Sequence, residues 1–135
     1  MKKIVLLLVL LYSSISMACE IKTYKVFYTP LEMQFFVPPS REYLIEHSFA
    51  FDLASSKLTC LFDMLSKQKG SKAKDNDYTG FRIIIQDKKN KKELIITTDK
   101  VIFSGNKVYK INVKIVDEIL DELNNEMKRI KNKKK

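Results

Sequence analysis

Apolar and polar positions alternate along several short segments of the chain, and this pattern predicts strands. Residues 21–28 alternate and are rich in β-forming side chains, so they predict a first strand. A second strand is predicted over 43–52, where one side of the strand would carry Tyr43, Ile45, His47, Phe49 and Phe51. Four shorter strands are predicted over 81–86, 93–98, 101–103 and 107–111.

Two other segments carry apolar residues at three-to-four spacing, which is typical of amphipathic helices. The first is expected to begin with Asp52 or Ser55 as its N-cap and to end just before Gly70. Its apolar face would consist of Ala54, Leu58, Leu61, Phe62 and Leu65. The second follows Asn112 as N-cap, and its apolar stripe would consist of Val113, Val116, Leu120, Leu123, Met127 and Ile130.

The order of these elements, β-β-α-β-β-β-β-α, predicts an α+β fold. We expect a small antiparallel sheet that carries both helices on one face, because each helix has a single apolar stripe to bury. The segment 70–77 between the first helix and the third strand is polar and is expected to be a surface loop.

The first residues have the layout of a secretory signal peptide. Lys2 and Lys3 precede an apolar run over 4–11, and a small-x-small cleavage site ends at Ala18. The apolar run is shorter than the roughly 20 residues that span a membrane. We therefore expect a cleaved signal over 1–18, a single domain over 19–127, and a basic C-terminal tail over 128–135.

The chain has two cysteines, Cys19 and Cys60, and an exported chain commonly pairs an even number of them. Cys60 lies about 200° around the predicted helix from Leu58, off the apolar face, where it can meet another segment. We therefore predict a Cys19–Cys60 disulfide and an exported protein, with the bacterial periplasm as its location.

A lipid anchor on Cys19 is the alternative, since cleavage after Ala18 would make Cys19 the first mature residue. Bacterial lipoproteins carry their lipid at that position, but Ser16 and Met17 do not match the usual sequence before the modified cysteine. Free thiols are the third alternative.

The formal net charge of +9 is concentrated at the chain ends. Of the 25 basic residues, two lie in the leader and six in the tail, which leaves 17 against 16 acidic residues in between. This nearly neutral body does not favour nucleic-acid binding, which needs a basic face on the folded domain. The tail could extend the last helix, fray in solvent, or touch anionic membranes through Lys128, Arg129, Lys131, Lys133, Lys134 and Lys135.

Signatures of catalysis, cofactors and metals are scarce. One histidine and two separated cysteines do not make a zinc site, and the three glycines do not form a nucleotide-binding loop. We therefore expect no metal, no cofactor and no enzymatic activity. His47 is the one candidate base, with Ser48 or Cys60 as a nucleophile it could activate, although a hydrogen-bonded structural histidine is the simpler interpretation.

The segment 30–39, PLEMQFFVPP, is the strongest candidate for a binding surface. It is bracketed by all three prolines of the chain, Pro30, Pro38 and Pro39, which favour an edge strand or an extended loop. Adjacent Phe35 and Phe36 would point to opposite sides, so the segment either wraps the domain and buries both rings or leaves one exposed. The predicted partner-binding residues are Met33, Phe35, Phe36 and Val37.

Size, leader and the absence of a catalytic signature make the outline similar to small exported inhibitor and immunity proteins of bacteria. The resemblance implies a non-enzymatic domain that binds and blocks a protein partner, such as a toxin or an envelope hydrolase. The alternatives are an envelope lipoprotein or structural component tethered through Cys19, and a small enzyme that uses His47.

Overall fold

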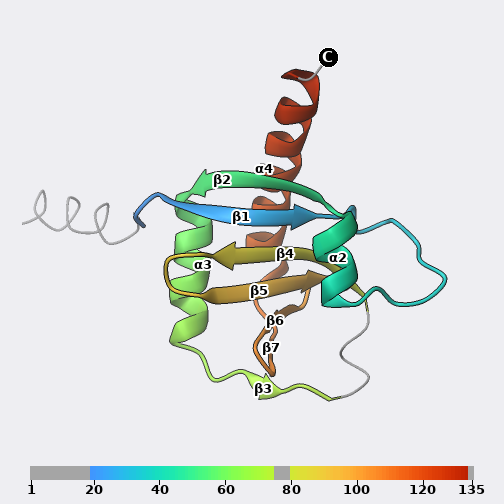
Figure 1. The fold of residues 1–135 in the computed structure, drawn as a ribbon. Helices are drawn as coiled ribbons and strands as arrows, with labels where there is room; N and C mark the ends of the chain where they lie inside the picture. Colours follow the sequence, from blue (N-terminus) through green and yellow to red (C-terminus); the bar gives the residue numbers. More distant parts are fainter. Residues whose placement is uncertain (1–18, 75–79, 134–135) are drawn as a thin grey trace, which may run out of the picture.

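A computed structural model describes residues 19–74 and 80–133 of the chain. The predicted signal peptide, residues 1–18, lies outside the described residues, as do Lys134 and Lys135 of the basic tail. The described parts form one antiparallel sheet and three helices, which confirms the α+β class (Figure 1).

The sheet has seven described strands in the order β2-β1-β4-β5-β6-β7-β3. Their bounds in chain order are β1 Lys22–Tyr28, β2 Phe49–Ser55, β3 Ser71–Lys72, β4 Phe81–Asp87, β5 Lys92–Thr97, β6 Ile102–Ser104 and β7 Lys107–Tyr109. The helices are α2 Arg41–His47, α3 Ser56–Ser66 and α4 Val113–Lys133. Five strands agree closely with the predicted ranges, because each is bounded by turns that the sequence marks clearly.

Both faces of the sheet are covered. Alternate strand residues, such as Val26, Ile83 and Ile85, form one apolar core with α3 and α4. The residues between them, such as Phe27 and Ile84, form a second core on the other face, where Leu44 of α2 is buried. Helices α3 and α4 thus share one face, as predicted, but the third helix on the opposite face was not expected (Figure 1).

The prediction of one strand over 43–52 is wrong in its first half. Residues 41–47 form α2, and the strand begins only at Phe49. The hydroxyl of Ser40 accepts a hydrogen bond from the Tyr43 N–H at 3.1 Å and thereby caps the first turn of the helix. Burial of Leu44 then stabilises the short helix, which could not persist without tertiary contacts.

The segment predicted as a polar surface loop contains β3, a strand of two residues. It pairs with β7 through Ser71↔Val108 and Lys72↔Lys107. Neither strand residue is buried, so no apolar pattern marks this strand in the sequence.

The N-cap of α3 is Ser55, since its hydroxyl accepts from the Leu58 N–H at 3.1 Å, whereas Asp52 lies within β2. Helix α4 follows Asn112, whose side-chain oxygen accepts from the Lys114 N–H at 2.9 Å. The residues of α4 that are buried are Val116, Ile119 and Leu123.

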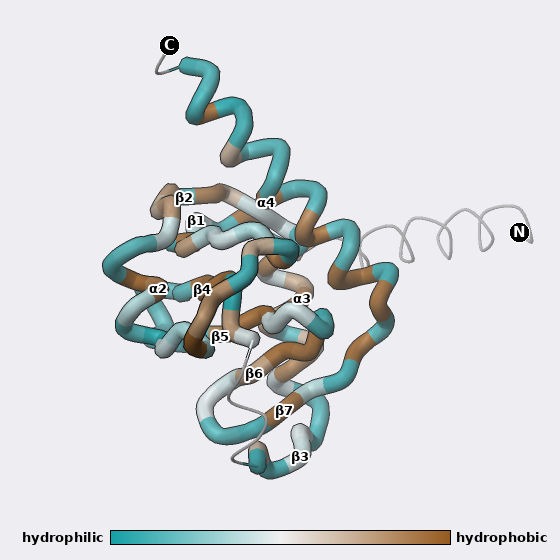
Figure 2. Tube along the Cα trace, turned by 90° about the vertical axis from the view of Figure 1, so that its right-hand side faces the viewer, coloured by the Kyte–Doolittle hydropathy of each residue, from teal (hydrophilic) through white to brown (hydrophobic). Residues whose placement is uncertain are grey.

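The first residue predicted for the apolar stripe of α4, Val113, is instead half-exposed. At the other end, the helix continues through residues 128–133 of the predicted tail. Figures 1 and 2 both show this end projecting beyond β2, and Figure 2 shows that it is mostly hydrophilic.

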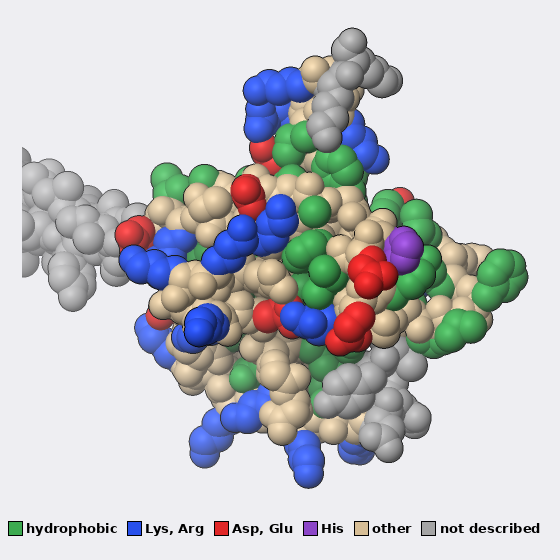
Figure 3. Space-filling model, in the orientation of Figure 1, with side chains coloured by type: hydrophobic (Ala, Val, Ile, Leu, Met, Phe, Trp, Pro, Cys, Tyr) green, Lys and Arg blue, Asp and Glu red, His purple; other side chains and the backbone are tan. Residues whose placement is uncertain are grey.

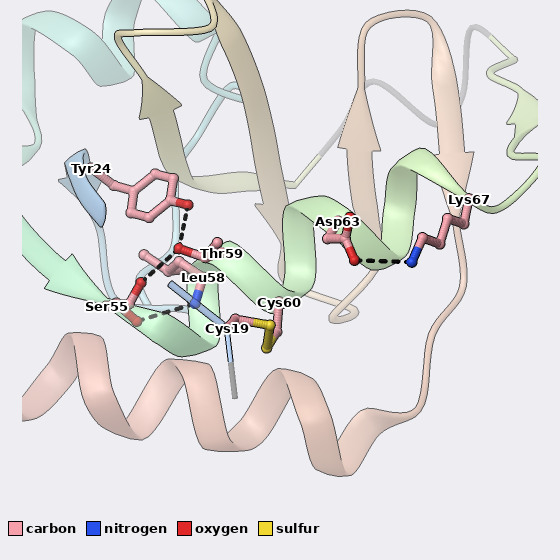
Figure 4. Close-up of a disulfide and its surroundings, with 8 residues drawn as sticks. All are labelled: Cys19, Tyr24, Ser55, Leu58, Thr59, Cys60, Asp63 and Lys67. Carbon is pink, nitrogen blue, oxygen red and sulfur yellow. Dashed lines mark hydrogen bonds and ion pairs between the residues drawn. A yellow bond between two sulfur atoms is a disulfide. The ribbon is translucent and has the colours of Figure 1, made fainter. Parts of the chain in front are cut away.

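Cys19 and Cys60 form a disulfide, with their Cα atoms 5.5 Å apart (Figure 4). The bond ties the residues before β1 to α3, next to Thr59, whose hydroxyl is 2.8 Å from that of Tyr24. A disulfide is typical of proteins that fold in an oxidising compartment. In the bonded form Cys19 has no thiol to carry a lipid. Within the described ranges, no helix has the length and apolar character to cross a membrane.

We expect removal of the disulfide to lower the free energy of unfolding by about 4 kcal/mol, because the bond closes a long loop in the unfolded chain. Urea unfolding of the mature protein, oxidised and reduced, measures the difference. The variant Cys60→Ser should match the reduced wild type, and reduction should add two hydrogens to the intact mass. Equal stability of the oxidised and reduced forms would contradict this prediction.

Candidate functional site

Residues 30–39 form an irregular loop between β1 and α2, which we call the apolar loop. Both of its ends are fixed. At the start, the Pro30 carbonyl accepts from the Met33 N–H at 3.1 Å, and at the end Pro39 is buried beside the capped start of α2. The prolines also restrict the backbone, so the loop has few conformations available.

The middle of the loop is exposed and apolar. Phe36 is fully exposed, while Val37 is 74% and Met33 46% exposed. Figure 3 shows apolar side chains at the edge of the molecule where Figure 1 places this loop. A large exposed apolar group on a small domain marks an interaction surface more often than a scattered single residue does.

Phe35 is turned inward instead. Its ring makes an edge-to-face contact with Tyr43 of α2, with ring centroids 6.1 Å apart. The guanidinium carbon of Arg82 lies 4.7 Å from the centroid of the same ring. Of the two rings, one therefore holds the loop to the domain and the other faces solvent.

Arg82, on the central strand β4, is the residue that fixes the middle of the loop. Its Nε and Nη2 atoms donate to the Met33 carbonyl at 3.2 and 3.0 Å, and Nη1 donates to the Phe81 carbonyl at 2.8 Å. Only 7% of the residue is exposed, and among the described residues no carboxylate pairs with it. Burial lowers the pKa of the Arg82 guanidinium, but the group stays charged at neutral pH. Hydrogen bonds from a charged donor are stronger than neutral ones, so the contact braces the loop.

Helix α2 provides a fixed platform beside the loop. Arg41 binds Glu93 of β5 through two hydrogen bonds of 2.6 and 2.8 Å, which raise the pKa of Arg41. Gln86 of β4 also donates to Glu93, at 2.8 Å. The short helix is therefore attached to the sheet by this ion pair as well as by its buried apolar side.

His47 lies at the end of α2 rather than on a strand. Its ring packs 4.3 Å from that of Tyr43, and its Nε2 is 3.8 Å from a carboxylate oxygen of Glu46. The hydroxyl of Ser48 bonds to that of Thr29 at 2.7 Å, and among the described residues no hydrogen bond joins Ser48 to His47. Cys60 is oxidised and has no thiol to activate. The described parts of the chain also contain no group of three or more metal-ligating side chains.

Four basic residues of the predicted tail lie on the projecting end of α4, where Figure 3 shows Lys and Arg side chains: Lys128, Arg129, Lys131 and Lys133. Arg129 pairs with Glu126 one turn earlier, and Lys131 lies 5.1 Å from the centroid of the Phe49 ring. The first contact is between exposed groups and is weakened by solvent.

The structure thus leaves Met33, Phe36 and Val37 of the predicted binding residues exposed at one place and turns Phe35 inward. Sequence reasoning missed Arg82, although a lone arginine in the apolar run FRIII over 81–85 was the available signal. Comparison of the chain with protein-family models, curated proteins and solved structures gave no match.

We expect Arg82→Met to free the middle of the loop, because Met33 loses both donors to its carbonyl. Backbone order parameters from ¹⁵N relaxation should fall below about 0.6 over residues 33–37, and unfolding should become easier by about 1–3 kcal/mol. The variant Phe36→Ala is the control. Its side chain is fully exposed, so stability should stay within about 0.5 kcal/mol of wild type. Unchanged loop order in the Arg82 variant would contradict the bracing role.

Proposed function

We propose that this protein is an exported, non-enzymatic binding domain of the bacterial periplasm that blocks a protein partner, as inhibitors and immunity proteins do. The observation that carries this proposal is the fully exposed Phe36 on a loop whose middle is braced by the buried Arg82. The disulfide and the predicted signal peptide support the exported location.

Burial of the Phe36 ring by a partner would yield about 1.5–3 kcal/mol, which is typical of an aromatic anchor residue. The loop is already held near its bound shape by the prolines and by Arg82, so little ordering entropy opposes binding. Because the loop projects from the domain, its partner must offer a concave apolar site. The active-site cleft of an envelope hydrolase or the binding groove of a toxin would have this shape.

Binding through the loop predicts that the double variant Phe36→Ala/Val37→Ala weakens the partner complex at least tenfold, as expected for a central apolar anchor. The mature disulfide-bonded protein would first be used to isolate a stoichiometric partner from periplasmic extract. The purified pair is then measured by isothermal titration calorimetry.

Ile21→Ala is the matched control, because Ile21 is also apolar and 70% exposed but lies before β1, outside the apolar loop. Its complex should keep wild-type affinity, and the loop variant should keep wild-type thermal stability. Recovery of no stoichiometric partner would overturn the proposal, as would equal affinity of the loop variant and the Ile21 control.

A further inference from the structure

A pocket of about 280 Å³ lies behind the apolar loop, between its base, the end of α2 and α4. Its walls are formed by residues 28–35 and 43–49 and by the distant segment 127–131. The two tip residues of the loop, Phe36 and Val37, are not among the residues that line it. The pocket therefore shares Met33 and Phe35 with the predicted binding residues but does not include the two exposed tip residues.

The walls of this pocket are apolar and largely aromatic. They are formed by Tyr28, Pro30, Met33, Phe35, Tyr43, Leu44, Phe49 and Met127. Several of these residues are held in place by their neighbours: Tyr43 packs against both Phe35 and His47, and Leu44 is buried in the second core. Met33 and Met127 have flexible, polarisable side chains that adapt to the shape of an apolar guest.

The polar groups that line the pocket are cationic or carry hydrogen-bond donors. The ammonium of Lys131 is positioned by its contact with the Phe49 ring, and the imidazole of His47 can donate an N–H whether it is charged or neutral. The lining residues Thr29 and Ser48 carry hydroxyls that are hydrogen-bonded to each other, and Tyr28 and Tyr43 carry two more hydroxyls. None of the lining residues is acidic, and the neighbouring carboxylate of Glu46 is 75% exposed.

We propose that this pocket binds a small molecule that has an apolar chain or ring and ends in a carboxylate. The apolar part would lie among the aromatic walls, and the carboxylate would meet Lys131, with His47 or the hydroxyl pair as a second donor. The volume is near the lower end of the range for small-molecule sites, which suits a ligand of roughly ten non-hydrogen atoms. A ligand with a positive charge is disfavoured, because Lys131 already places its ammonium against the aromatic wall.

Three probes with the same chain and different charge test this assignment: octanoate, octanamide and octylammonium. Each is titrated into the mature, disulfide-bonded protein, and binding is followed by ¹H–¹⁵N correlation spectra. Octanoate should bind most tightly and octylammonium most weakly, and the amide shifts should centre on Thr29, His47, Phe49 and Met127. An aromatic acid, 3-phenylpropionate, tests whether a ring fits the same walls as an aliphatic chain.

The variant Lys131→Gln should weaken octanoate binding about fivefold, as expected for one partly exposed charge pair, and leave octanamide binding unchanged. Lys133→Gln is the matched control, since Lys133 is exposed on the same helix and does not line the pocket. It should bind octanoate like the wild type. Both substitutions lie on the surface of α4, so the fold should be retained, which circular dichroism checks.

Equal binding of octylammonium and octanoate would overturn the proposal, as would an unchanged octanoate affinity of the Lys131 variant. Amide shifts that centre elsewhere, or no shift at millimolar octanoate, would also overturn it. The double variant Phe36→Ala/Val37→Ala should keep octanoate binding, because neither residue lines the pocket. Failure of the protein-binding proposal would therefore leave this one standing, and the reverse also holds.

Discussion

The contact between Arg82 and the Met33 carbonyl is the interaction on which the exposed surface of this protein depends. A guanidinium in the interior is costly unless its N–H groups are hydrogen-bonded, and here the backbone carbonyls of Met33 and Phe81 accept from it. The hydrogen bonds to the Met33 carbonyl therefore both satisfy the buried Arg82 guanidinium and fix the loop. The aromatic ring of Phe35 also packs against the guanidinium, while the adjacent Phe36 is fully exposed.

Arg82 can have this role because β4 is central in the sheet and is covered on both faces. Helices α3 and α4 bury one side of the strand, while Leu44 of α2 is buried on the other. The loop is thus attached to the most deeply buried strand of the domain. A rigid base beneath an exposed apolar tip reduces the entropy that binding must overcome. Such a base is a physical requirement of the proposed binding function.

The same arrangement generates the pocket behind the loop. The loop base and α2 form two of its sides, and α4 closes the third because it continues beyond β2. A helix that ended with the sheet would not bring Met127 and Lys131 to this place. The basic end of α4 therefore contributes Lys131 to the pocket. Its positive charges also interact favourably with the negative C-terminal end of the helix dipole. The two proposed recognition surfaces, one convex and one concave, both adjoin the loop segment that Arg82 holds.

Local pattern in the sequence was enough to predict most strands, both long helices and the α+β class, because each depends on side-chain periodicity and on nearby turn and cap residues. The disulfide could be predicted because the chain has two cysteines and Cys60 lies off the apolar face of its helix. The apolar tip of the loop was recognisable from its composition. The sequence could not show whether Phe35 or Phe36 would face inward. Adjacent residues of an extended segment point to opposite sides, and only the tertiary structure decides which side packs against the domain.

Tertiary structure alone decided the features that join distant residues. The alternation over 43–52 predicted a strand, yet residues 41–47 form α2 because the Ser40 cap, the burial of Leu44 and the Arg41–Glu93 pair act together. The role of Arg82 depends on a carbonyl 49 residues away, and the pocket joins segments from opposite ends of the domain. Periodicity reports which side of an element is apolar. It carries no information about which other element will cover that side, and this pairing is what places the loop, the pocket and their charges.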